Sequence, residues 1–144
     1  MNVTKLFQCR SELMSLRTLT ILQAAYAFLA IGYLLLSFWR LQATGEALSA
    51  APAGPAIAML SVYLLALLLP HYGYLRGYQV AMLVFLVLVC GGGVIGNIAR
   101  YLDSGLEHYV SFIAFACAVA INAFGSVLNV LAVFGWYSRP TQTV

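Results

Sequence analysis

Four long apolar stretches, separated by charged residues, dominate the pattern of the chain. They cover residues 18–39, 54–70, 78–99 and 109–136. A helix needs about 20 residues to cross the roughly 30 Å hydrocarbon core of a bilayer. Because lipid offers no hydrogen-bond partners to the backbone, a spanning stretch must pair its own polar groups within a helix. The pattern therefore predicts an all-α integral membrane four-helix bundle, and the short connections predict antiparallel hairpins.

The composition excludes several classes of protein. Hydrophobic residues make up 63% and charged residues 8% of the chain, against roughly 45–50% and about 25% in soluble domains. This balance excludes a disordered chain and a disulfide-rich secreted scaffold. Seven Lys and Arg against four Asp and Glu give no basic surface for nucleic acid. We expect a single membrane domain, residues 1–144, with membrane lipids among its partners.

Basic residues predict the orientation, since Lys and Arg in short loops stay on the cytoplasmic side. The termini and the loop between the second and third stretches carry five of them: Lys5, Arg10, Arg17, Arg76 and Arg139. The other two loops carry Arg40 and Arg100. Both termini are therefore expected in the cytoplasm. Tyr72, Tyr74 and Tyr78 near that loop are interpreted as an aromatic belt, with an aromatic-ligand or quinone site as the alternative.

Small residues mark candidate helix-packing positions. Membrane helices associate where small residues let their backbones approach. Gly92 and Gly96 are four apart on the third stretch, with Gly93 beside them, and Gly125 lies on the fourth. We expect close helix packing at these positions, with a backbone opened for a ligand as the alternative. Three consecutive glycines, 91–93, also predict a kink or break near Gly92.

Amides and a hydroxyl form a predicted polar face. Asn122, Ser126 and Asn129, at spacings of four and three, share one side of the fourth stretch. An amide in hydrocarbon needs a partner or an aqueous cavity, because leaving it unpaired costs a few kcal/mol. Gln23 and Asn97 are the further candidates for such a polar seam or for ligand contact.

The depth of each amide in the predicted membrane identifies a partner for Asn129. Asn129 lies about 10 Å from Trp136, at the inner end of its helix, and Gln23 lies about 8 Å from Thr18, at the inner end of the first. The two amides are therefore nearly level, and we predict that Gln23 contacts Asn129.

The sequence lacks the residues that several common membrane-protein functions require. No ionisable side chain lies deep in a predicted span, which disfavours a proton-coupled transporter. His71 and His108 fall in loops on opposite sides of the membrane, so they cannot hold one haem within a single chain. Cys90 and Cys117 are interpreted as packing residues. We expect no metal site and no cofactor. Arg100, Asp103, Glu107 and His108 cluster in the third loop, where acid/base catalysis is the alternative to ordinary helix-end charges.

One segment resembles known families. The run Gly91-Gly92-Gly93-Val94-Ile95-Gly96-Asn97-Ile98-Ala99-Arg100 is similar to the Gly-Gly-x-x-Gly-Asn-x-x-Asp-Arg motif of the lipoprotein signal peptidase. With Arg100 matched to its arginine, the catalytic aspartate falls at Ala99, so peptidase activity is not expected. The Gly-Gly-x-x-Gly-x-x-x-Arg helix end also resembles small uncharacterised bacterial four-helix membrane proteins. That resemblance implies a multi-pass protein of the bacterial cytoplasmic (inner) membrane.

The leading functional hypothesis is a non-enzymatic accessory or assembly subunit that acts through helix packing, as a homo-oligomer or with a membrane protein partner. The alternative is a small channel or carrier, or a protein that binds a lipid or quinone through the polar face. A pocket of roughly 300 Å³ or more with convergent amides favours the alternative, since that is the usual lower size of small-molecule sites.

Overall fold

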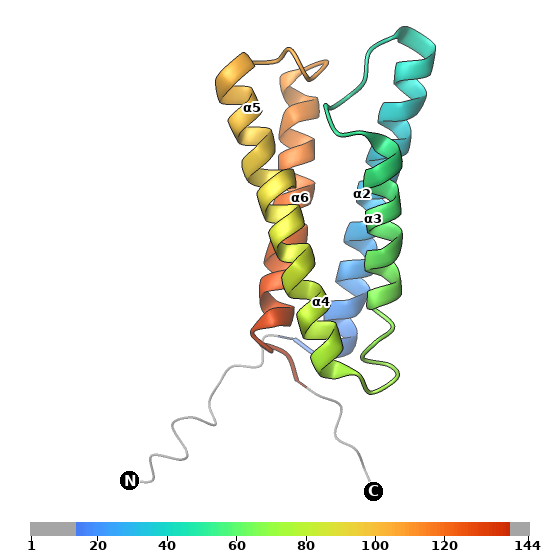
Figure 1. Ribbon diagram of the computed structural model, residues 1–144, viewed down its shortest axis with the longest axis vertical. Helices are drawn as coiled ribbons and strands as arrows, with labels where there is room; N and C mark the ends of the chain where they lie inside the picture. The colour runs from blue at the N-terminus through green and yellow to red at the C-terminus, as the bar shows by residue number, and fades with distance from the viewer. Residues whose placement is uncertain (1–13, 139–144) are drawn as a thin grey trace, which may run out of the picture.

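The computed structural model describes residues 14–138. Its elements are α2 (Leu16–Thr44), α3 (Ala53–Ala66), α4 (Leu75–Leu88), the π-helical segment η1 (Val89–Ile95), α5 (Gly96–Ser104) and α6 (Phe112–Val133). Figure 1 shows α4, η1 and α5 following one another as a single long helix, so the described chain forms an elongated bundle. The all-α prediction is confirmed.

Three helices are long and apolar enough to cross a membrane: Leu16–Thr44, Leu75–Ser104 and Phe112–Val133. Large apolar side chains cover their outer faces, and Phe28, Val87 and Ile113 are each more than 60% exposed. Such a surface is suited to lipid rather than to water. These features indicate a multi-pass membrane protein.

The second predicted span is shorter than expected. The apolar helix α3 has 14 residues, which cover about 21 Å, and it ends at Ala66 instead of residue 70. Pro70 has no N–H to donate to the Ala66 carbonyl, so the helix cannot continue through it. The Leu69 N–H bonds to the Ala66 carbonyl instead, at 3.2 Å, and turns lead from there to α4.

Both ends of the described chain meet at one end of the bundle. The Leu16 N–H donates to the Ser138 carbonyl at 3.0 Å, and the Ser138 N–H donates to the Met14 carbonyl at 2.9 Å. We call this the terminal end, and the opposite end, with loops 45–52 and 105–111, the distal end (Figure 1). Lys5, Arg10 and Arg139, which entered the predicted orientation, lie outside the described residues.

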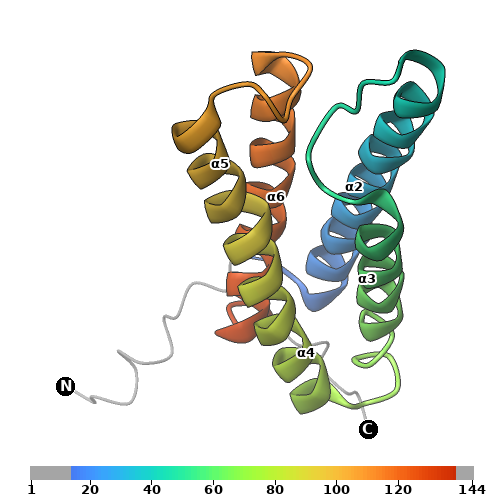
Figure 2. The ribbon, with the colours of Figure 1, turned by 45° about the horizontal axis from the view of Figure 1, so that its top comes forward.

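Two hairpins build the bundle. One is α2 with α3, and the other is the long helix α4–η1–α5 with α6. The hairpins meet where α6 packs along α2 and where α3 packs on α4. Among the described helices, α5 packs only on η1 and α6. In the distal half α5 therefore packs on neither helix of the first hairpin, and Figure 2 shows its ribbon apart from α2 and α3.

A buried polar network joins all four helices in the terminal half. Gln23 Nε2 of α2 donates to Asn129 Oδ1 of α6 at 3.2 Å, which confirms the predicted contact. The Tyr63 hydroxyl of α3 donates to the same Asn129 oxygen at 2.8 Å. The Tyr78 hydroxyl of α4 donates to Gln23 Oε1 at 2.6 Å, so the interpretation of Tyr78 as a belt residue was wrong. Gln23 Nε2 also lies 3.2 Å from the Met82 sulfur.

Next to this network, Gly125 of α6 packs against the ring of Tyr26 on α2. A Cβ at residue 125 would overlap the Tyr26 ring atoms, so only glycine permits this approach. Tyr26 in turn makes an edge-to-face contact with Tyr63, with ring centroids 5.6 Å apart. The helices are thus fixed in one rotational setting.

The glycine-rich part of the third stretch departs from α-helical geometry without breaking. Val89–Ile95 is π-helical, and the Gly96 N–H bonds to the Gly91 carbonyl five residues earlier. Such segments widen the helix and are frequent at functional sites. The disturbance predicted near Gly92 therefore takes the form of a π-helical segment.

Asn129→Ala is expected to lower the free energy of unfolding by about 1–3 kcal/mol, because it removes the acceptor of two buried donors, Gln23 Nε2 and the Tyr63 hydroxyl. Unfolding in mixed micelles with a denaturing detergent measures this loss. Ser61→Ala is the matched control, since the Ser61 hydroxyl is exposed and bonds only within its own helix. Equal effects of the two substitutions would contradict a stabilising role for the network.

Candidate functional site

A pocket of about 310 Å³ lies between the two hairpins, in the distal half of the bundle. Its walls come from α2, α3, the last residue of α4, η1, α5 and α6 and from loop 45–52. Because α3 begins only at Ala53, loop 45–52 returns from the end of α2 toward the middle of the bundle, and Ser49, Ala51 and Pro52 of this loop line the pocket. Figure 2 shows the loop descending from the end of α2 to the start of α3.

Hydrogen bonds hold loop 45–52 in place. The Leu48 N–H donates to Ser37 Oγ of α2 at 3.0 Å. The Tyr33 hydroxyl of α2 lies 2.9 Å from the Ala114 carbonyl of α6 and 3.4 Å from the Leu48 carbonyl, so it connects both hairpins beside the loop. The low-complexity run 50–55, which reads as a plain turn in the sequence, therefore forms part of a pocket wall.

Asn97 organises the polar end of the pocket. Its side chain is buried, with 5% exposed. Asn97 Nδ2 donates to the Gly93 carbonyl at 2.6 Å, and Asn97 Oδ1 accepts from the Tyr109 hydroxyl at 2.8 Å and from Arg100 Nη1 at 3.1 Å. Three bonds thus fix the orientation of the amide, and the amide in turn orients the guanidinium group.

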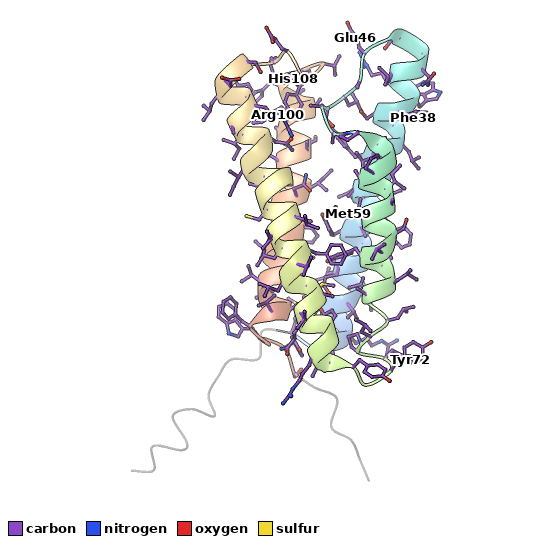
Figure 3. All side chains as sticks on the ribbon, viewed as in Figure 1. Phe38, Glu46, Met59, Tyr72, Arg100 and His108 are labelled. Atoms are coloured by element: carbon purple, nitrogen blue, oxygen red, sulfur yellow. The ribbon has the colours of Figure 1, made fainter. Side chains whose placement is uncertain are left out.

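Arg100 brings a positive charge to the pocket wall. Within residues 14–138 the only ion pair is Arg40 with Glu46, at 3.8 Å, so Arg100 has no carboxylate partner there. Asp103, Glu107 and His108 are exposed and do not line this pocket. Figure 3 places Arg100 and His108 at the same end of the bundle, but the sequence cluster does not form one site.

The predicted polar face divides into three environments. Asn129 is completely buried in the polar network. The Ser126 hydroxyl bonds to the Asn122 carbonyl of its own helix at 2.8 Å. Asn122 alone of the three lines the pocket, and its Nδ2 donates to the Ala118 carbonyl at 2.8 Å. The three residues therefore do not line one continuous polar path.

The candidate packing glycines also separate. Gly93 lies against Asn122, since a Cβ there would come within 2.5 Å of Asn122 Cγ. Gly92 lines the pocket, and a Cβ on it would meet no atom within 4 Å. Gly96 faces its own helix, because its Cβ would lie 3.3 Å from the Gly91 carbonyl oxygen. Only Gly93 and Gly125 lie in close contact with a side chain of a neighbouring helix.

The lining is typical of a binding site. It includes no carboxylate, imidazole or thiol, the groups that most often act as acid, base or nucleophile. In the part of the chain that the structure describes, no group of three His, Cys, Asp or Glu side chains is placed to hold a metal. Cys90 and Cys117 are free thiols. An arginine and the amide of Asn97 toward the distal end, with mostly apolar walls elsewhere, are suited to hold an amphiphilic molecule.

Comparisons with protein-family models, with curated proteins and with solved structures find no match for this chain. The resemblance to small bacterial four-helix membrane proteins therefore stays a prediction, and the site must be interpreted from its own geometry.

Gly93→Ala is expected to displace the Asn122 side chain and to lower the free energy of unfolding by about 1–3 kcal/mol, because the new methyl group overlaps Asn122. Gly91→Ala is the control, since a Cβ at residue 91 meets nothing within 4 Å. Detergent-induced unfolding of both variants measures the difference. If Gly91→Ala proved as destabilising as Gly93→Ala, the contact between η1 and α6 would not be the cause.

Proposed function

We propose that this chain is a non-enzymatic, multi-pass membrane protein that binds a lipid or a quinone in the pocket between its two hairpins. The observation that carries the proposal is a pocket of about 310 Å³ that has Arg100 and Asn97 in its wall toward the distal end and a mostly apolar lining elsewhere. This volume is at the lower limit of ordinary small-molecule sites, which are mostly apolar with a few placed polar groups.

The order of residues along the long helix supports an amphiphilic occupant. Arg100 and Asn97 line the pocket toward the distal end, and Val89 and Leu88 line it toward the middle of the bundle. Twelve helical residues separate Leu88 from Arg100, a distance of about 18 Å along the axis. A molecule with a polar head and an apolar body matches this gradient in polarity.

The proposed orientation puts both termini in the cytoplasm of a bacterial cell, with the protein in its cytoplasmic membrane. Arg17 and Arg76 belong to the terminal end, and Lys and Arg favour the cytoplasmic side. The polar end of the pocket then lies in the outer leaflet. Among partners, membrane lipids follow directly from the proposed function.

A bulky side chain in the pocket tests the proposal. Gly92→Leu projects into the open space of the pocket, whereas Gly91→Leu makes the same change at a residue outside the lining. Native mass spectrometry of protein released gently from its own membrane is expected to show one retained lipid or quinone per chain in the wild type and in Gly91→Leu, with at least about a tenfold loss in Gly92→Leu. Retention unchanged by Gly92→Leu would overturn the proposal.

A second candidate function, an accessory or assembly subunit, has a separate observation in its favour. Gly91 is exposed, and a Cβ on it would meet nothing within 4 Å. Val87 and Ile95, four residues to either side, are 65% and 61% exposed. The three residues form an outward face where the backbone is accessible to a helix of a second copy or of a membrane protein partner.

The same two variants separate the candidates. Gly91→Leu is expected to reduce the oligomeric mass if this face is an interface, because leucine keeps the helices apart. Gly92→Leu is expected to leave that mass unchanged. An oligomer that survives Gly91→Leu would exclude this face as the assembly surface.

A further inference from the structure

We infer that the occupant of the pocket is an anionic phospholipid, whose phosphate group is bound by Arg100. This inference rests on the proposed binding function and narrows the class of ligand. It follows from the charge of the arginine, from its orientation by Asn97, and from its depth in the long helix.

The charge of Arg100 is not balanced within the described chain. Among residues 14–138, the guanidinium of Arg100 donates from Nη1 to Asn97 Oδ1, a neutral acceptor, and no carboxylate lies within ion-pair distance of it. The other cation at the distal end, Arg40, has Glu46 as its partner. An arginine has five N–H donors in a planar fork, so most of the donors of Arg100 remain for a ligand.

Asn97 acts as a positioning residue for this charge. Its amide is buried and bound at both ends, by the Gly93 carbonyl and by the Tyr109 hydroxyl. The oxygen that accepts from Tyr109 also accepts from Arg100, so the guanidinium is attached to a rigid part of the bundle. A fixed guanidinium binds a phosphate with two parallel hydrogen bonds at a smaller entropic cost than a free one.

The depth of Arg100 matches that of a phospholipid headgroup. Arg100 is four residues before Ser104, the last residue of α5, which corresponds to about 6 Å along the axis. Arginine near a helix end reaches the interface, where lipid phosphates lie. From there the apolar lining continues toward Leu60 and Met59 of α3, where an acyl chain fits. Figure 3 shows Met59 about midway along the bundle, with Arg100 toward the distal end.

A quinone is a poorer partner than a phosphate for the guanidinium of Arg100. Its carbonyl oxygens accept hydrogen bonds, but the molecule carries no charge to balance the guanidinium. Arg100 is exposed, and a charge-assisted hydrogen bond to a phosphate is stronger than a hydrogen bond to a neutral carbonyl. An anionic ligand therefore gains more from this site than a neutral one. Phosphate supplies both the charge and the acceptor geometry.

The test uses the full chain in nanodiscs that contain equal amounts of phosphatidylglycerol and phosphatidylcholine. Native mass spectrometry after release counts the lipid that stays bound. The wild type is expected to retain the anionic lipid about tenfold in excess over the zwitterionic one. Arg100→Gln is expected to abolish this preference while still retaining one lipid, and retention also shows that the variant is folded. Arg40→Gln is the matched control and is expected to keep the preference.

The outcomes separate the inference from the function on which it rests. If Gly92→Leu loses the bound lipid but Arg100→Gln keeps the full anionic preference, the pocket binds lipid and the assignment of the phosphate to Arg100 is wrong. If Gly92→Leu retains lipid as the wild type does, the proposed function itself fails. A quinone retained in place of phospholipid, after addition of a quinone to the same nanodiscs, would overturn the inference and leave the proposed function standing.

Discussion

The hydrogen bond between Gln23 and Asn129 is the constraint from which the arrangement of the four helices follows. In an apolar surrounding, hydrophobic burial no longer selects one packing, and paired amides and close contacts must do so. Each helix contributes at least one member of the network, and Asn129 Oδ1 accepts from both Gln23 Nε2 and the Tyr63 hydroxyl. Rotating α6 away from α2 would leave buried donors unpaired. The same rotational setting brings Gly125 against Tyr26 and Asn122 against Gly93.

The pocket exists because this network lies toward one end of the bundle. In the terminal half every helix is connected through side-chain amides and hydroxyls. Toward the distal end, before α3 begins at Ala53, loop 45–52 takes the place of that helix, while α5 packs on neither α2 nor α3. Pro52 contributes to this difference, because it immediately precedes the first residue of α3 and disfavours helical backbone at the residue before it. Because α3 is shorter than the three long helices, it leaves space for the pocket beside the long helix α4–η1–α5.

The sequence predicted those features that depend on spacing along one uninterrupted helix. Depth along two long helices is enough to pair Gln23 with Asn129, and consecutive glycines are enough to locate the disturbance in the third stretch. Tyr78 was missed as a member of the network, because aromatic residues near helix ends are typical of an interfacial belt as well. Tyr63 was missed because a single tyrosine in an apolar stretch gives no signal of its partner. The pocket was missed because it depends on how loop 45–52 folds back, which hydrophobicity does not encode. Four neighbouring charged or basic residues also suggested one cluster, although helix geometry directs Arg100 alone toward the pocket.

Asn129 and Asn97 have different roles: the first stabilises the bundle, and the second positions a group for binding. Asn129 is completely buried, and its partners are side chains from other helices, so its hydrogen bonds stabilise the bundle. Asn129 Nδ2 has no acceptor among the described residues, and this unpaired donor lowers the net stability that the network contributes. Asn97 bonds within its own long helix and to Tyr109 just beyond it, and it connects the two hairpins through none of these bonds. The group that it orients, Arg100, keeps donors available at the pocket wall. The N–H donors of Arg100 that the fold leaves available therefore lie where a ligand can reach them.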